Sequence, residues 1–180
     1  MLISSLDIPG AYLISNEVHS DNRGTFENIF KEKDFEDLGI DFSIKQVNLS
    51  RNIQAGTLRG LHFQKQPSSE SKIVNCIAGK IFDVLVDLRP DSHFFGRWQS
   101  VILEPSKNAV VIPQGVAHGF QTLTVNCVVQ YLHSNEYVAD MNAGLKFDDP
   151  SIDILWPKDI SMISERDKNL PSLEKLRKYL

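Results

Sequence analysis

The sequence predicts an all-β fold, an antiparallel sandwich or barrel with a few short helices. Two observations support this prediction. Apolar residues in the middle of the chain alternate with a period of two, as in strands, and do not recur every three or four residues. Turn-forming stretches separate these runs at short intervals. The 180 residues suffice for one buried core but hardly for two, so one domain is expected.

Helical patterns are confined to two places. Residues 31–38 (KEKDFEDL) form a short amphipathic stretch that Gly39 ends. Residues 172–180 (SLEKLRKYL) follow Pro171 and are expected to form a final helix.

The clearest strand is predicted at residues 81–88 (IFDVLVDL). Its even-numbered residues place apolar side chains on one face, whereas Asp83 and Asp87 lie on the other. Further strands are expected at residues 99–103, 109–112 and 127–133. Turn formers separate them at residues 89–92, 104–106 and 113–115.

Composition and charge exclude several classes of function. A net charge of −4 argues against nonspecific binding to nucleic acid or to an anionic membrane. The first residues lack the basic and apolar regions of a secretory signal, and no apolar run approaches the roughly 20 residues that span a bilayer. We therefore expect a cytoplasmic protein. Cys76 and Cys127 lie in apolar, strand-like segments and are interpreted as reduced, buried thiols, although a disulfide stays open.

The first segment with candidate functional side chains is residues 57–64 (TLRGLHFQ). Polar side chains in an apolar strand are costly unless they face a polar cavity. Regular alternation would place Arg59 and His62 on opposite faces, but a bulge at Gly60 could re-aim one of them. A satisfied core histidine beside a surface arginine is an equally weighted alternative.

A second histidine lies in residues 111–120 (VIPQGVAHGF), where a turn would bring His118 to the mouth of a barrel. Together with His62 it raises the alternative of a metal site. Metal-binding barrels of this kind usually carry two close histidines and a nearby glutamate, whereas the nearest acid after His62 is Glu70. The expectation is therefore no metal and no cofactor.

Two more segments carry candidate groups. In the strand 127–133, Tyr131 and His133 share a face, so the tyrosine either packs in the core or donates a proton to a ligand. In residues 163–167 (ISERD), an acid could fold back onto His62 and fix its tautomer, or simply lie in a solvated turn.

Taken together, these segments resemble one family, the dTDP-4-dehydrorhamnose 3,5-epimerases. The resemblance covers nearly the whole chain as an ordered series of motifs. The matching stretches are DNRGTF at 21–26, QVNLS at 46–50, LRGLHFQ at 58–64, SKIV at 71–74, FDVLVDLR at 82–89, FGRW at 95–98, IPQGVAHGF at 112–120 and DDPSIDILWP at 148–157. The resemblance implies a single domain over residues 1–180, a jelly-roll barrel (double-stranded β-helix) of the cupin type. It also implies a homodimer that works without metal.

The resemblance assigns roles position by position. His62 matches the catalytic base and Asp167 its partner. Lys72 matches the lysine beside the keto oxygen of the substrate, and Tyr131 matches the proton donor on the opposite face. The positions expected to hold the sugar and the nucleotide are Arg23, Phe26, Gln46, Asn48, Arg59, His118, Tyr137 and Arg166.

The sequence departs from the family pattern around the expected pocket rim. Asn28 and Asn142 stand where acids are common, and Arg166 where a lysine is usual. His19 replaces an aromatic residue, and Val111 a tryptophan. These departures spare the base, the acid and the lysine, but they weaken the assignment of thymidine as the nucleotide base.

The leading hypothesis is epimerisation at C3 and C5 of dTDP-4-keto-6-deoxyglucose, by proton abstraction next to the C4 ketone and reprotonation from the other face. Inversion at one carbon only, of a dTDP-, CDP- or GDP-linked 4-ketohexose, is the first alternative. A metal-dependent cupin enzyme and a non-catalytic module that binds nucleotide sugars are the others. The expected partners are thus a nucleotide-linked 4-ketosugar and a second copy of the chain.

Overall fold

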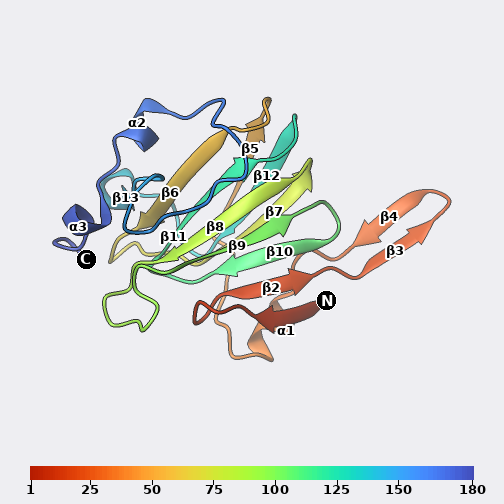
Figure 1. Ribbon diagram of the computed structural model, residues 1–180. Coiled ribbons are helices and arrows are strands. Elements are labelled where there is room, and N and C mark those ends of the chain that lie inside the picture. The colour runs from red at the N-terminus through yellow and green to blue at the C-terminus, as the bar shows by residue number, and fades with distance from the viewer.

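The computed structural model describes residues 1–180 as two antiparallel sheets that pack face to face (Figure 1). The first sheet has the order β1 (Leu2–Ser5), β2 (Tyr12–Ser15), β10 (Asn108–Ile112), β7 (Lys72–Ala78), β12 (Cys127–His133), β5 (Gln46–Asn52). The second has the order β13 (Asn142–Gly144), β6 (Leu58–Gln64), β11 (Val116–Thr122), β8 (Ile81–Asp87), β9 (Trp98–Leu103). The structure confirms the all-β prediction and the four strands predicted between residues 81 and 133.

Three apolar clusters make up the core. The largest fills the space between the sheets and includes Val74, Leu85 and Phe120. The other two lie on the outer faces, one around Leu61 and Val86, the other around Phe35, Ile73 and Leu132. Apolar residues therefore cover much of both faces of each sheet, which accounts for the many strand residues that are buried irrespective of alternation, although Val47 and Leu49 of β5 stay exposed.

The polar face of β8 points into the interior. Asp83 and Asp87 are both fully buried, and each has a hydrogen-bonding partner. Asp83 lies 2.7 Å from His118, and Asp87 lies 2.6 Å from Arg89.

Short helices lie at the periphery. The helix predicted at residues 31–38 is confirmed as α1 (Glu32–Glu36). The predicted C-terminal helix is much shorter than residues 172–180, since α3 covers only Leu173–Leu176. Ser172 caps its start, but beyond Leu176 the chain has no buried side chain to hold further turns. No helix in the structure has the length and apolar character that crossing a membrane requires.

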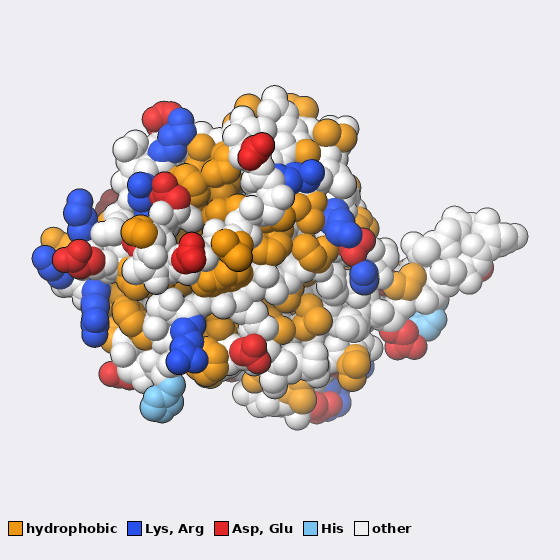
Figure 2. Space-filling model, in the orientation of Figure 1, with side chains coloured by type: hydrophobic (Ala, Val, Ile, Leu, Met, Phe, Trp, Pro, Cys, Tyr) orange, Lys and Arg blue, Asp and Glu red, His pale blue; other side chains and the backbone are white.

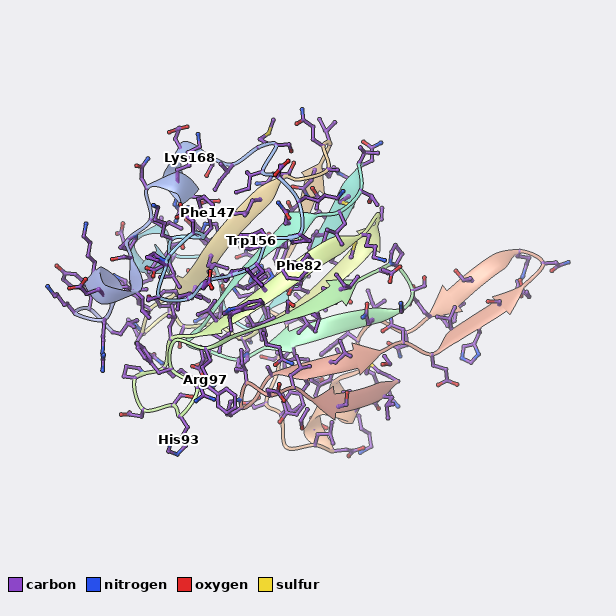
Figure 3. The ribbon with its side chains drawn as sticks, in the orientation of Figure 1. Phe82, His93, Arg97, Phe147, Trp156 and Lys168 are labelled. Atoms are coloured by element: carbon purple, nitrogen blue, oxygen red, sulfur yellow. The ribbon has the colours of Figure 1, made fainter.

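The chain after β13 covers the outer face of the second sheet. Trp156 packs edge-on against Phe82 of β8, with ring centroids 6.0 Å apart, and donates a hydrogen bond to the carbonyl of Phe147 (Figure 3). The same segment carries α2 (Glu165–Lys168) to β6. An element from the end of the chain thereby reaches the strand that holds His62.

One hairpin stands apart from the barrel. β3 (Val18–Asp21) pairs only with β4 (Gly24–Glu27), and the two project well beyond both sheets (Figure 1). Figure 2 shows the same hairpin as an arm extending from the body of the molecule. Residues at its tip are consequently far from the barrel interior.

Candidate active site

A cavity of about 350 Å³ lies between the two sheets and has a volume typical of ligand pockets. Strands of both sheets and the segment around α2 contribute to its wall. The predicted site residues that line it are Asn48, Arg59, His62, Lys72, His118, Tyr131, Tyr137, Arg166 and Asp167.

A bulge in β6 places Arg59 and His62 on the same cavity. The pairing of β6 with β11 shifts register between His118 and Phe120, as the sequence suggested for Gly60. Only glycine fits there, because a Cβ on Gly60 would lie 2.5 Å from the Cα of Gly119. The irregularity thus re-aims a side chain that regular alternation would have turned away.

His62 and Asp167 form a hydrogen-bonded pair. His62 Nε2 lies 2.7 Å from Asp167 Oδ1, and Asp167 Oδ2 accepts a hydrogen bond from the backbone N–H of Gly60. Burial alone would raise the pKa of Asp167, but the hydrogen bond and charge of His62, together with hydrogen bonds from Gly60 and Ser164, hold the pKa below its usual value. An ionised carboxylate keeps the proton on Nε2, so Nδ1 of His62 is the nitrogen with a free lone pair.

Ser164 holds the Asp167 side of this pair in place. As the N-cap of α2, it accepts a hydrogen bond from the backbone N–H of Asp167 at 3.0 Å. The fold-back of residues 163–167 onto His62, one of two readings of the sequence, is therefore the observed one.

Tyr131 occupies the facing wall, on β12 of the first sheet. Burial raises its pKa far above the ordinary value, and the negative charge of Asp83 raises it further. The phenol is consequently protonated at neutral pH. Two imidazole rings fix the aromatic ring: His133 stacks on it at 5.7 Å, and His118 meets it edge-on at 5.9 Å.

His118 lies directly opposite His62 in the β6–β11 pair. Its Nε2 is 2.7 Å from Oδ1 of the fully buried Asp83, whose other oxygen has no hydrogen-bond partner. Burial raises the pKa of Asp83, although the charge of His118 acts against this. Each histidine of the second sheet is thus oriented by its own aspartate, and no group of three or more His, Cys, Asp or Glu side chains is arranged to hold a metal ion.

Lys72 is buried on β7 beside two residues to which the sequence assigned no role. Its Nζ lies 3.0 Å from Glu70 Oε1, and Glu70 Oε2 lies 2.9 Å from His133 Nδ1. Both Glu70 and His133 line the cavity. The sequence indicated only one of them. The strand pattern places His133 on the same face as Tyr131, whereas nothing in the sequence shows that Glu70 reaches the cavity.

Three predicted ligand residues do not line the cavity. Gln46 adjoins it through a hydrogen bond to Asn48 at 3.1 Å. Arg23 and Phe26 lie on the projecting hairpin, where Phe26 is 75% exposed and Arg23 pairs with its neighbour Asp21. Matching motifs identified these two positions, but motifs do not reveal that the hairpin leaves the barrel.

The arrangement is suited to proton transfer at carbon. A base with a free lone pair lies on one sheet, and a protonated phenol lies on the other. An ammonium group lies in the same wall as the phenol, where it could stabilise negative charge on an oxygen. The arginines Arg59 and Arg166 add positive charge for an anionic ligand.

Comparison with known proteins gives one consistent result. Residues 5–175 match the family model described as dTDP-4-dehydrorhamnose 3,5-epimerase. A dTDP-4-dehydrorhamnose 3,5-epimerase of Sinorhizobium fredii is 42% identical over 175 residues, which are 96% of this chain and 90% of the relative.

Solved structures agree. An epimerase of Mycobacterium tuberculosis superposes with a TM-score of 0.94 at 38% identity, covering 99% of this chain and 92% of that one. A 3′-monoepimerase of Streptomyces bikiniensis in complex with dTDP-quinovose superposes with a TM-score of 0.90 at 34% identity, covering 97% and 89%. Enzymes that differ in the number of carbons inverted are therefore similarly close to this chain.

Proposed function

Because the chain belongs to the dTDP-4-dehydrorhamnose 3,5-epimerase family of cupin-fold isomerases, we propose that it inverts both C3 and C5 of dTDP-4-keto-6-deoxyglucose. The product is dTDP-4-keto-L-rhamnose. One observation supports this proposal above all: His62 and Tyr131 line one cavity from opposite sheets, with Lys72 in the same wall as Tyr131.

Each inversion needs a base and an acid on opposite faces of the carbon. Nδ1 of His62 takes the hydrogen next to the C4 ketone, and the electron pair of the C–H bond moves into an enolate. The hydroxyl of Tyr131 then gives its proton to the other face, and solvent returns that proton to the tyrosinate while His62 loses its own. Acid–base catalysis of this kind contributes about 10²–10⁴-fold to the rate.

The enolate oxygen is the second requirement. The ammonium of Lys72 donates a hydrogen bond to it as negative charge develops there. One such preorganised donor lowers the barrier by about 3–4 kcal/mol. Asp167 keeps His62 in the tautomer that presents Nδ1, and it stabilises the imidazolium that forms.

Inversion at a single carbon is the alternative to be separated from this proposal. The similarity to a 3′-monoepimerase favours it. The decisive experiment is incubation of the protein with dTDP-4-keto-6-deoxyglucose in D₂O, followed by NMR of the sugar. We expect deuterium at both C3 and C5, together with the inverted product. Deuterium at one carbon would establish a monoepimerase, and no exchange with dTDP-, CDP- or GDP-linked ketosugars would refute the enzymatic function.

The projecting hairpin supports a further part of the proposal, a homodimer. Arg23 and Phe26 can hold a nucleotide only in a cavity other than that of their own barrel, since their hairpin points away from it. In the proposed dimer, this hairpin covers the cavity of the second copy. We expect sedimentation to give twice the chain mass and Phe26→Ala to raise KM about tenfold with little change in kcat. A monomeric active enzyme would contradict the dimer.

A further inference from the structure

A continuous series of hydrogen bonds crosses the cavity wall of the first sheet. His133 of β12 lies directly opposite Lys72 on β7 and directly opposite Gln46 on β5. Directly opposed residues on neighbouring strands point to the same face. The three side chains therefore form a row, and His133 occupies its centre.

On the Lys72 side of the row, Glu70 contacts both Lys72 and His133. One carboxylate oxygen lies 3.0 Å from Nζ of Lys72, and the other lies 2.9 Å from Nδ1 of His133. The three side chains are only 7%, 8% and 13% exposed for Lys72, Glu70 and His133 respectively. Burial alone would raise the pKa of Glu70, but the hydrogen bond from His133 and the charge of Lys72 together hold it below the usual value. Glu70 is thus an anion shared by two partners.

On the other side, the series continues to the rim of the cavity. His133 Nε2 lies 3.4 Å from Nδ2 of Asn48, whose Oδ1 accepts from Nε2 of Gln46 at 3.1 Å. Oε1 of Gln46 accepts from the backbone N–H of Tyr137 at 2.9 Å. Because the backbone N–H of Tyr137 can only donate, Gln46 must turn its Oε1 toward it and its Nε2 toward Asn48. Asn48 then presents Oδ1 to Gln46 and Nδ2 to His133. Asn48 must then donate to His133, so the imidazole carries its proton on Nδ1, toward Glu70.

We propose that Glu70 and His133 are positioning residues that hold the ammonium of Lys72 against the substrate's ketone oxygen and connect it to the ligand-binding residue Asn48. This inference rests on the epimerase function proposed above. A lysine has a long, flexible side chain and three N–H donors. Glu70 takes one donor and fixes the direction of the others, and His133 in turn fixes Glu70. Neither residue needs to touch the reacting atoms.

The other two histidines of the cavity belong to different pairs, and Arg59 is bonded to Asn52. His62 is bonded to Asp167, and His118 to Asp83. Tyr131 contacts His133 through ring stacking alone. The effect of His133 on Lys72 therefore runs through Glu70, and this makes it separable by mutation.

The test compares two substitutions at one position. His133→Phe keeps a ring to stack on Tyr131 but removes both hydrogen bonds, whereas His133→Asn keeps a donor near the position of Nδ1. A misplaced catalytic group costs up to about 10²-fold in rate, so we expect His133→Phe to lower kcat by about 10–100-fold and His133→Asn to recover most of it. The affinity for dTDP, measured by calorimetry, should change by less than about twofold, because dTDP lacks the sugar ketone that Lys72 is proposed to bind.

A double-mutant comparison identifies the route of the effect. In a Lys72→Met background, measured by slow deuterium uptake, His133→Phe and Glu70→Gln should each lower the rate no further. Equal losses with and without Lys72, or a loss of dTDP affinity as large as the loss of kcat, would overturn the inference while leaving the epimerase function intact. An unsubstituted protein that exchanges no hydrogen would overturn both.

Discussion

Replacing His62 by Asn is expected to lower both solvent exchange and inversion by about 10²–10⁴-fold, the contribution of a positioned general base. Asparagine fills part of the space of the imidazole ring but has no basic nitrogen. The neighbouring carboxylate of Asp167 is poorly placed to replace it, because it is buried behind the imidazole and accepts a hydrogen bond from it. Deuterium uptake at C3 and C5, followed by NMR in D₂O, measures the loss.

His93 provides the matched control for this substitution. It is exposed on the loop between β8 and β9 (Figure 3) and does not line the cavity. His93→Asn should therefore leave exchange and inversion unchanged. If His62→Asn retained more than about a tenth of the parent rate, His62 would not be the base, because a general base contributes far more than that.

Replacing Tyr131 by Phe should separate exchange from inversion. The phenol is the proposed donor on the face opposite His62. Burial raises the pKa of Tyr131, so the phenol is protonated when the enolate forms. Without it, we expect inversion to fall by about 10²–10⁴-fold. His62 can still remove the hydrogen and return a deuteron to the same face, so labelled but uninverted ketosugar should accumulate. Mass spectrometry and NMR of the recovered sugar distinguish the two species.

Tyr12→Phe is the corresponding control, because Tyr12 lies on β2 and packs against the outer apolar cluster of the first sheet. That variant should behave like the parent. If Tyr131→Phe reduced exchange and inversion by the same factor, the phenol would not act as the second-face donor, and another acid would have to be sought in the cavity.

Local patterns in the sequence were sufficient to predict much of the fold. The alternating residues 81–88 and the β-rich run 127–133 are both strands. Gly60 correctly indicated the bulge that brings Arg59 and His62 together. The C-terminal helix was predicted too long, because local amphipathicity does not show that Tyr179 lies 79% exposed with nothing to pack against.

The predicted residues that line the cavity came from strand patterns or, like Asp167 on α2, from the resemblance to the family. The position of His133 relative to Glu70 and Lys72 depends on the pairing of β7 with β12, in which His133 lies opposite Lys72 although the two are far apart along the chain. Such long-range register cannot be read from one sequence. For the same reason, the motif around Arg23 did not show that its hairpin projects from the two sheets.

The aspartate that orients His62 comes from a segment held to β6 by few contacts. A parallel bridge joins Thr57 to Met162, and Leu58 donates a backbone hydrogen bond to the carbonyl of Met162. Opening of this segment would move the carboxylate of Asp167 away from the imidazole of His62 without breaking the hydrogen bonds between the strands of the two sheets. Under mild denaturation, activity would then be lost before global unfolding. The free energy of opening this segment and the free energy of global unfolding would be two different quantities.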